Sequence, residues 1–251
     1  MIVEYQRPRT IGEALHLLQR VDPVSFPMGG GTILNRPSDK KYALVDLQDL
    51  RLEELQARGN VLVLGATLKL QRLLEAEVTP PSLRAVILQE GNYNLRQMAS
   101  VAGSLVAADG RSPFATALLA LDTSLVWLPG EKQVRLGDLL PVREASMRGK
   151  LIVRVEIPIN ARLAYHYVSR TPADLPIVCA ALARWPSGRT RLALGGYGKA
   201  PLLAMDGPEA EGLETAARSA YAHAGDEWAS AEYRQEMAAL LARRGLETVL
   251  G

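Results

Sequence analysis

The sequence is poor in cysteine, histidine and aromatic residues. Cys179 is the only cysteine, which excludes an intrachain disulfide and any iron–sulfur cluster held by four thiolates of this chain. The three histidines, His16, His166 and His223, are far apart and have no ligand-like spacing with carboxylates. We therefore expect no metal site.

Excess charge of one sign and long apolar runs are lacking too. The 29 Lys and Arg are balanced by 27 Asp and Glu, with both signs interspersed, which argues against a nucleic-acid partner. No apolar run approaches the roughly 18 residues that suggest a membrane span. The N-terminal MIVEYQRPRT lacks the basic and apolar sections of a signal peptide. We expect a cytoplasmic protein without a transmembrane segment.

The first part of the chain alternates short apolar segments with helical patterns. With 251 residues, 48% of them hydrophobic, the chain can form two domains. Thr10 and Glu13 form a capping-box pattern, which predicts a helix from Ile11 to Arg20. Further strands are predicted at 24–27, 42–46, 61–64, 124–128 and 151–157, and further helices from Thr67, at 82–89 and at 115–121.

The pattern changes near Asn160. Longer strands are predicted at 163–170, 177–185 and 189–194, followed by amphipathic helices at 208–224 and 229–246. An antiparallel sheet followed by helices indicates a separate α+β unit. We place the domains at 1–159 and 160–251.

Three consecutive glycines stand in FPMGGGTILN, residues 26–35. Consecutive glycines can expose their N–H groups in a concave array that accepts phosphate. The stretch is neither GxGxxG nor a P-loop with its lysine, and a plain surface turn is the commoner structure. A second glycine-bearing segment, ASVAGSLVAADGRSP at 99–113, is a weaker indication.

An ordered set of motifs resembles one family. PMGGGTILN resembles AGG(T/Q)(D/S)LL, and SVAGSLVAAD resembles (T/S)(I/V)GG(N/S)L. These motifs belong to the FAD-binding medium subunits of molybdenum hydroxylases, which include carbon monoxide dehydrogenase medium subunits and the FAD domain of xanthine dehydrogenase. The likeness continues through GAT at 65–67, IVRVEIP, YHYVSRTPADLPIVCAALA, LALGGYGKAPLL and SAEYRQEMAALLARR. It covers nearly the whole chain.

The resemblance implies both a fold and a site. The fold is an α+β arrangement: a PCMH-type FAD-binding domain of two α/β subdomains, then a small C-terminal domain with an antiparallel three-stranded sheet and helices. Matched residue by residue, the FAD pyrophosphate lies between two groups whose backbone N–H groups do most of the binding. These groups are Gly29, Gly30, Gly31, Thr32, Ile33 and Leu34 on one side and Ser100, Val101, Ala102, Gly103 and Ser104 on the other.

Three more residues complete the expected site. His166, or its neighbour Tyr167, falls where relatives often carry a lysine near the flavin ring. Tyr197 is flanked by glycines at 195, 196 and 198, which leave space for a planar group. Asp109 stands near Pro113, which replaces an acidic residue of the family pattern; Asp109 either substitutes for that residue or is a solvent-facing loop residue.

Two departures affect the pyrophosphate site. Ala102 replaces the first glycine of the usual pair, which restricts the backbone if φ is positive there, and Ile33 takes a position that is usually Ser or Asp. Separately, Arg170 and Asp174 are spaced either for a structural ion pair or for a flavin or partner contact.

The resemblance implies an oxidoreductase flavoprotein subunit. Electrons pass from a molybdenum-cofactor large subunit through the [2Fe-2S] clusters of a small subunit to FAD on this chain, and then to NAD, a quinone or oxygen. The flavin performs this chemistry, so no catalytic residue is named. The alternative, favoured by Ile33, Ala102 and Pro113, is a structural or assembly subunit with weakened or lost FAD binding. A self-contained oxidase of this fold is disfavoured because no substrate-domain insertion is present.

Overall fold

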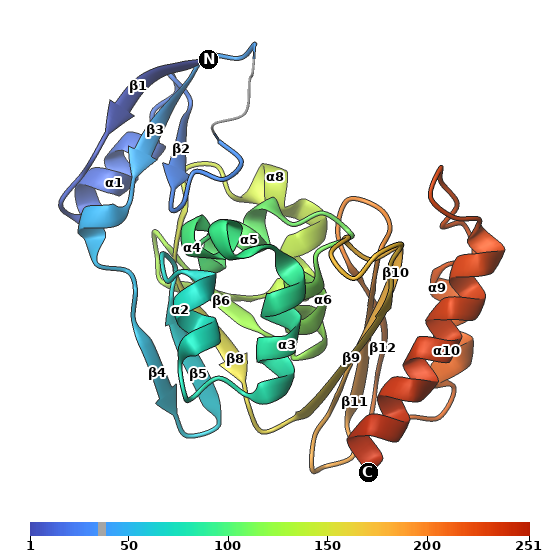
Figure 1. Ribbon diagram of the computed structural model, residues 1–251. Helices are drawn as coiled ribbons and strands as arrows, with labels where there is room; N and C mark the ends of the chain where they lie inside the picture. Colours follow the sequence, from blue (N-terminus) through green and yellow to red (C-terminus); the bar gives the residue numbers. More distant parts are fainter. Residues whose placement is uncertain (35–38) are drawn as a thin grey trace.

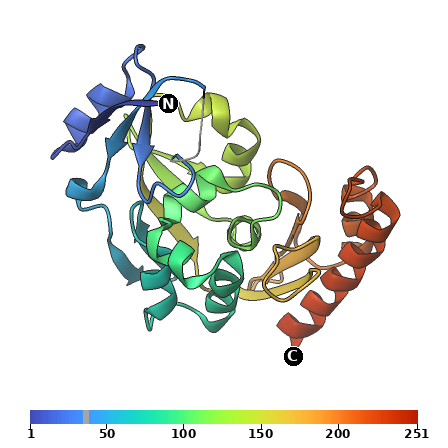
Figure 2. The same cartoon turned by 45° about the horizontal axis from the view of Figure 1, so that its top comes forward.

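The chain folds into three sheets that follow one another along the molecule (Figure 1). The computed structural model describes residues 1–34 and 39–251, so Asn35, the last residue of the first glycine stretch, lies outside the described residues. The N-terminal sheet and the two C-terminal helices lie at opposite ends in both views, with the second sheet and its helices between them (Figures 1 and 2).

The N-terminal sheet is parallel and ends at the glycine stretch. Its spatial order is β1 (Ile2–Gln6), β3 (Tyr42–Asp46) and β2 (Ser25–Met28). The capping box is confirmed, because Glu13 N donates to Thr10 Oγ1 at 3.2 Å and Thr10 N donates to the Glu13 carboxylate at 3.2 Å, and it starts α1 (Ile11–Leu18). The 3₁₀ turn η1 (Gln48–Leu50) follows β3.

The second sheet is antiparallel and carries most of the helices. Its spatial order is β4 (Leu55–Arg58), β5 (Val61–Gly65), β8 (Leu151–Pro158), β6 (Ser124–Leu128) and β7 (Lys132–Arg135). The helical segments between these strands are α2 (Leu70–Glu75), α3 (Pro81–Glu90), α4 (Tyr93–Met98), α5 (Val101–Ala107), α6 (Pro113–Ala120), α7 (Leu136–Leu139), η2 (Leu140–Val142) and α8 (Arg143–Ser146). The parallel and the antiparallel sheet correspond to the two expected subdomains.

The C-terminal sheet has one strand more than expected. β9 (Arg162–Val168), β10 (Val178–Arg184) and β11 (Thr190–Gly195) are the three predicted strands, and β12 (Leu202–Gly207) joins β11 as a fourth. The strand was missed because LLAMDG has no period-2 alternation and follows a glycine-rich turn. Helices α9 (Leu213–Ala220) and α10 (Ala231–Leu250) cover one face of this sheet (Figure 1).

The other face of the C-terminal sheet packs on α6. All eight residues of α6 are buried. Along β10, Ala181 and Ala183 belong to the core that includes α6, whereas Leu182 belongs to the core beneath α10. Small side chains on one face let α6 approach closely, and the larger ones fill the space under α10. The two domains predicted from the sequence, at 1–159 and 160–251 and called here the two sequence-defined units, therefore share a core.

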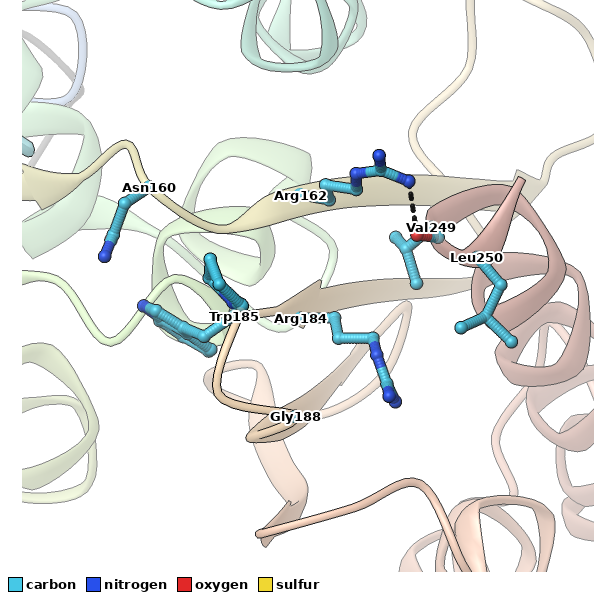
Figure 3. A pocket seen from close by; sticks show the side chains of 8 residues that line it. Asn160, Arg162, Arg184, Trp185, Gly188, Val249 and Leu250 are labelled. Atoms are coloured by element: carbon cyan, nitrogen blue, oxygen red, sulfur yellow. Dashed lines mark hydrogen bonds between the residues drawn. The ribbon is translucent and has the colours of Figure 1, made fainter.

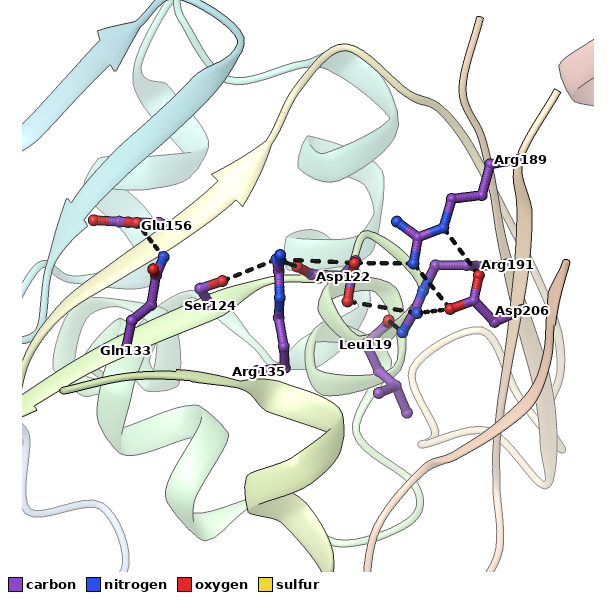
Figure 4. A network of polar contacts seen from close by, with 9 residues as sticks. All are labelled: Leu119, Asp122, Ser124, Gln133, Arg135, Glu156, Arg189, Arg191 and Asp206. Atoms are coloured by element: carbon purple, nitrogen blue, oxygen red, sulfur yellow. Dashed lines mark hydrogen bonds and ion pairs between the residues drawn. The ribbon is translucent and has the colours of Figure 1, made fainter. Parts of the chain in front are cut away.

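A polar network joins the same two units at another point (Figure 4). Asp122, just after α6, forms ion pairs with Arg189 at 3.0 Å and with Arg191 at 3.5 Å. Both arginines are on or next to β11 and also pair with Asp206 of β12. Their hydrogen bonds hold the pKa of Asp206 below its usual value. The buried Arg191 thus has two carboxylate partners.

The chain leaves the second sheet at Pro158 and enters the C-terminal sheet at Arg162. A boundary at 159/160 stays a prediction. None of the helices described is both long and apolar enough to cross a bilayer.

Candidate functional site

The first glycine stretch follows β2 and lies against the end of α4. A Cβ on Gly30 would overlap the carbonyl oxygen of Met98, and a Cβ on Gly29 would overlap the hydroxyl of Ser100. Gly31 has φ +68°, a conformation that glycine adopts at little cost. The structure therefore brings the two glycine-bearing segments together, as the resemblance implies.

The contact changes the reason for glycine at position 30. Besides any ligand, the chain's own backbone at Met98 takes the position that a Cβ on Gly30 would occupy. Substitution at Gly30 therefore affects packing as well as any ligand.

The outer side of this loop carries unused donors. No hydrogen bond within residues 1–34 and 39–251 takes the backbone N–H of Gly30, Gly31 or Thr32. The side chain of Ile33 is 39% exposed, and the carbonyl of Leu34 accepts from Tyr42 Oη at 2.6 Å. A row of free N–H groups on a glycine turn is the array that binds phosphate.

The second segment is a short helix rather than a loop. Ser100 is the N-cap of α5 and its hydroxyl accepts from Gly103 N at 3.3 Å. Val101 N donates to Leu68 O at 2.8 Å and Ala102 N donates to Ala66 O at 3.1 Å. These two N–H groups are already engaged, contrary to the expectation that they face a phosphate.

Ala102 is helical and does not need positive φ. The expected strain at this position is therefore absent. Ser104 N also bonds within the segment, to Ser100 O at 2.8 Å. Exposed Gly103 and partly buried Ser104 are the members of this segment that remain accessible.

Sequence reasoning missed Lys69, which connects the two segments. Its Nζ donates to Gly29 O at 3.0 Å and to Met98 O at 3.0 Å, and its backbone pairs with Ser100 in an isolated bridge. Burial lowers the pKa of Lys69, and the carboxylates of Asp46 and Glu53 partly offset that effect. Its place directly after the GAT motif and Leu68 was the available signal.

Asp109 and Tyr197 form a second group, at the contact between the two sequence-defined units. Gly110 N donates to Gly198 O at 2.9 Å, and Gly196 N donates to Gly110 O at 2.6 Å. Exposed Asp109 accepts from Arg111 N at 2.8 Å, the geometry of a loop aspartate.

The chain itself fills the space beside Gly195 and Gly196, the two glycines that precede Tyr197. Cβ atoms at Gly195 and Gly196 would overlap Thr116 and Ile177 respectively. The ring of Tyr197 lies 5.0 Å from the Arg234 guanidinium. A Cβ on Gly198 would meet nothing within 4 Å, so this side of the turn is open, and a role for Tyr197 beside a planar group stays a prediction.

His166 lies apart from both groups. On β9 it faces α10, where its Nε2 is 3.1 Å from Thr248 Oγ1. Tyr165 and Tyr167 face the other way and stack on each other at 5.8 Å. Burial and Arg244 lower the pKa of His166. A role for His166 in FAD binding stays a prediction.

Arg170 and Asp174 do not form the ion pair considered from their spacing. The Arg170 guanidinium lies 4.7 Å from the Trp228 ring, whereas the Asp174 carboxylate accepts from Thr171 N at 3.1 Å. Arg111 contacts the same ring at 4.5 Å. These contacts fasten the loop after β9 to the loop before α10.

Glu90 is the second polar residue that sequence reasoning missed. Its carboxylate accepts from Ser112 Oγ at 2.9 Å and from Phe114 N at 2.8 Å, at the start of α6. Burial raises the pKa of Glu90 to about 7. A carboxylate therefore does stand at this helix start, although Pro113 occupies the acidic position of the family pattern.

A cavity of about 460 Å³ lies elsewhere, at the outer end of the C-terminal sheet (Figure 3). Arg162 and Arg184, direct partners in the β9–β10 register, lie on its rim with Trp185 and Leu250. Arg162 donates to Val249 O at 3.1 Å and so caps the last turn of α10. No residue of the predicted site lines this cavity.

The fold and the first loop together define a class of protein. A parallel and an antiparallel α/β unit, a glycine turn with free N–H groups and a lysine beneath it are suited to a phosphate-bearing cofactor. A family model described as FAD binding domain in molybdopterin dehydrogenase matches residues 1–160. The chain belongs to this family, so the resemblance seen in the motifs is confirmed.

Known relatives agree with this assignment. The uncharacterized protein YgfM of Escherichia coli K12 is 31% identical over 210 residues, covering 82% of this chain and 79% of that protein. The carbon monoxide dehydrogenase medium chain of Afipia carboxidovorans is 24% identical, over 97% of this chain and 95% of that one.

Solved structures show the same fold. A chain of Cu,Mo-CO dehydrogenase in its cyanide-inactivated form superposes with a TM-score of 0.84 at 23% identity, covering 99% of this chain and 98% of that one. A chain of quinoline 2-oxidoreductase from Pseudomonas putida 86 gives 0.76 at 22% identity, covering 98% and 96%.

The chain's own residues fit FAD at the first loop. The Gly30, Gly31 and Thr32 N–H groups are free of described acceptors, and Lys69 places a cationic side chain behind them. Both features favour a pyrophosphate.

Proposed function

We propose that this chain is the FAD-binding electron-transfer subunit of a molybdenum hydroxylase complex. It would receive electrons from the iron–sulfur clusters of a small subunit, which are supplied by a molybdenum-cofactor large subunit, and pass them to an external acceptor such as NAD, a quinone or oxygen. The proposal includes a cytoplasmic location. Family membership and the medium-chain relatives support this role.

The observation that carries the proposal is the unused row of N–H groups beside Lys69. Gly30, Gly31 and Thr32 would bind the pyrophosphate, with Gly103 and Ser104 on the opposite side. FAD, when bound, supplies the redox chemistry. The protein residues bind and orient the cofactor and exclude water from it, so none of them is assigned a proton-transfer step.

The runner-up is a structural or assembly subunit of the same fold with weakened FAD binding. The engaged N–H groups of Val101 and Ala102 favour it, since fewer donors remain on that side of the loop. Exposed Ile33 adds no polar group. Under this alternative the chain joins the complex but holds little or no flavin.

The deciding experiment is co-expression with candidate large and small subunits, followed by purification and a flavin absorption spectrum. The proposal expects copurification, about one FAD per chain, and reduction of that flavin when the large subunit receives its substrate. A complex that assembles, is colourless in the flavin region and takes up no added FAD would leave the runner-up standing.

A further inference from the structure

Lys69 controls which way the first glycine loop faces. It precedes α2 in an extended conformation, and its half-buried side chain reaches the carbonyl oxygens of Gly29 and Met98, both at 3.0 Å. The two carbonyls belong to different segments, and Lys69 is the side chain that bonds to both. The contact therefore fixes the loop relative to the end of α4.

The bond to Gly29 has a geometric consequence. A trans peptide is planar, with its C=O and N–H pointing in opposite directions. Because the Gly29 carbonyl points at the Lys69 amine, the N–H of Gly30 points away from it. That N–H and the next two donate to no residue in the described part of the chain. Lys69 thereby turns the Gly30 N–H away from its own amine.

Lys69 also contributes charge. An ammonium group has three donors and no acceptor, and two of the three are used here. Asp46, one of the two carboxylates whose charges act on Lys69, is already engaged, because it accepts from Tyr5 Oη and from Gln48 N and lies 3.6 Å from Arg7. Lys69 has no ion pair within the described part of the chain, so its positive charge adds to the field at the loop.

We propose that Lys69 is the positioning residue of the pyrophosphate site: it aims the Gly30 N–H at the ligand and places a positive charge behind that peptide group. This inference rests on the proposed function of the chain. The ligand chemistry is the diphosphate of a dinucleotide, and the isoalloxazine ring has no part in the Lys69 contact.

The test compares K69M, K69R and wild type as full chains stripped of flavin. FAD, ADP and riboflavin are titrated into each, with flavin fluorescence or calorimetry giving Kd. Loss of the two Lys69 hydrogen bonds that position the loop, together with loss of its positive charge, predicts that K69M weakens FAD and ADP binding by about tenfold or more. Riboflavin, which lacks phosphate, should bind all three proteins alike. K69R should retain most of the affinity for FAD and ADP.

Lys150 is the matched control, because it is a partly buried lysine whose amine contacts the Trp127 ring at 4.1 Å and no glycine loop. K150M should leave the Kd for FAD unchanged. The salt dependence of FAD binding should be weaker in K69M than in K150M, because one cation near the phosphates is gone.

The results separate two failures. If wild type binds FAD and folded K69M binds FAD and ADP equally well, the Lys69 inference is overturned and the proposed function stands. If wild type takes up no FAD even in its complex, the proposed function is overturned, and the Lys69 inference that rests on it is overturned as well.

A measurement on wild type covers the case in which K69M does not fold. Addition of ADP should shift the backbone amide resonances of Gly30 and Gly31. Unshifted Gly30 and Gly31 resonances at saturating ADP would overturn the inference.

Discussion

The chain has two glycine-rich turns, at 29–31 and 195–198, and they use glycine differently. The first packs one side against Met98, and its Gly30, Gly31 and Thr32 N–H groups have no acceptor in residues 1–34 and 39–251. The second is enclosed at its Gly196 side: Gly196 and Gly198 bond to Gly110, and Ile177 takes the space beside Gly196, whereas Gly198 is open. In both turns glycine permits backbone-to-backbone contact, and the N–H groups of the first turn are the basis of the binding site that we propose there.

The largest expected effect is at the enclosed turn. Gly196 has φ +109°, and a Cβ there would overlap the backbone of Ile177, so G196A should lower the free energy of unfolding by about 3 kcal/mol or more. G198A has a positive φ but open space and should cost about 1 kcal/mol. Thermal unfolding measures both. Equal effects would contradict the enclosed character of this turn.

The second largest effect is expected for G30A, which should lower both the stability of the protein and its FAD content. Its Cβ meets the Met98 carbonyl, which predicts a loss of about 2 kcal/mol together with reduced FAD content. G12A is the control, since Gly12 lies in α1 with nothing near its Cβ position and should gain about 0.5–1 kcal/mol. If G30A were as stable as wild type and lost only FAD, the Met98 contact would not matter for stability, and glycine at position 30 would serve ligand binding alone.

The free energy of unfolding should depend on pH through Glu90. Its carboxylate accepts hydrogen bonds at the start of α6, the helix that follows Gly110. Its pKa is raised from 4.5 to about 7 in the folded protein, so the folded state binds the proton more tightly than the unfolded one. The free energy of unfolding should fall as pH rises from 4.5 to about 7 and then level off.

E90Q removes this titration and should be more stable than wild type at pH 8 by about 2 kcal/mol. Denaturant unfolding at several pH values from 5 to 8 gives the result. An identical pH slope in wild type and E90Q would show that Glu90 does not titrate in this range.

The smallest effect is expected for Y197F. The hydroxyl of Tyr197 has a single long bond, 3.4 Å to His223 O, and the ring keeps its contact with Arg234. Stability should change by less than about 0.5 kcal/mol, and FAD affinity should be unaltered. A large loss of FAD in Y197F would instead place the flavin at the enclosed turn.

The sequence predicted local structure where the pattern itself carries the physics. The capping box at Thr10, Ser112 as the cap of α6 and the strands β9 to β11 could all be read from residue spacing. The motif order identified the family and the two glycine segments that meet. These features depend on neighbours in the chain.

What the sequence did not predict depends on residues brought together from afar. Lys69 contacts Gly29 and Met98 only after the two sheets are placed, and Glu90 reaches Ser112 from the end of another helix. The hydrogen bonds from the Val101 and Ala102 N–H groups to the carbonyls of Leu68 and Ala66 also join residues that are far apart in the chain. Glycine content alone could not distinguish free from enclosed backbone, because the neighbour that fills the space lies elsewhere in the chain.

The burial of α6 on all sides has a consequence for how the protein comes apart. The family match ends at residue 160, but α6 lies between the second sheet and β10 and β11, so a fragment that ends there would expose an apolar helix to water. The two units should therefore unfold in a single cooperative transition. A truncation at the boundary should therefore yield an aggregating fragment rather than a smaller flavin-binding module.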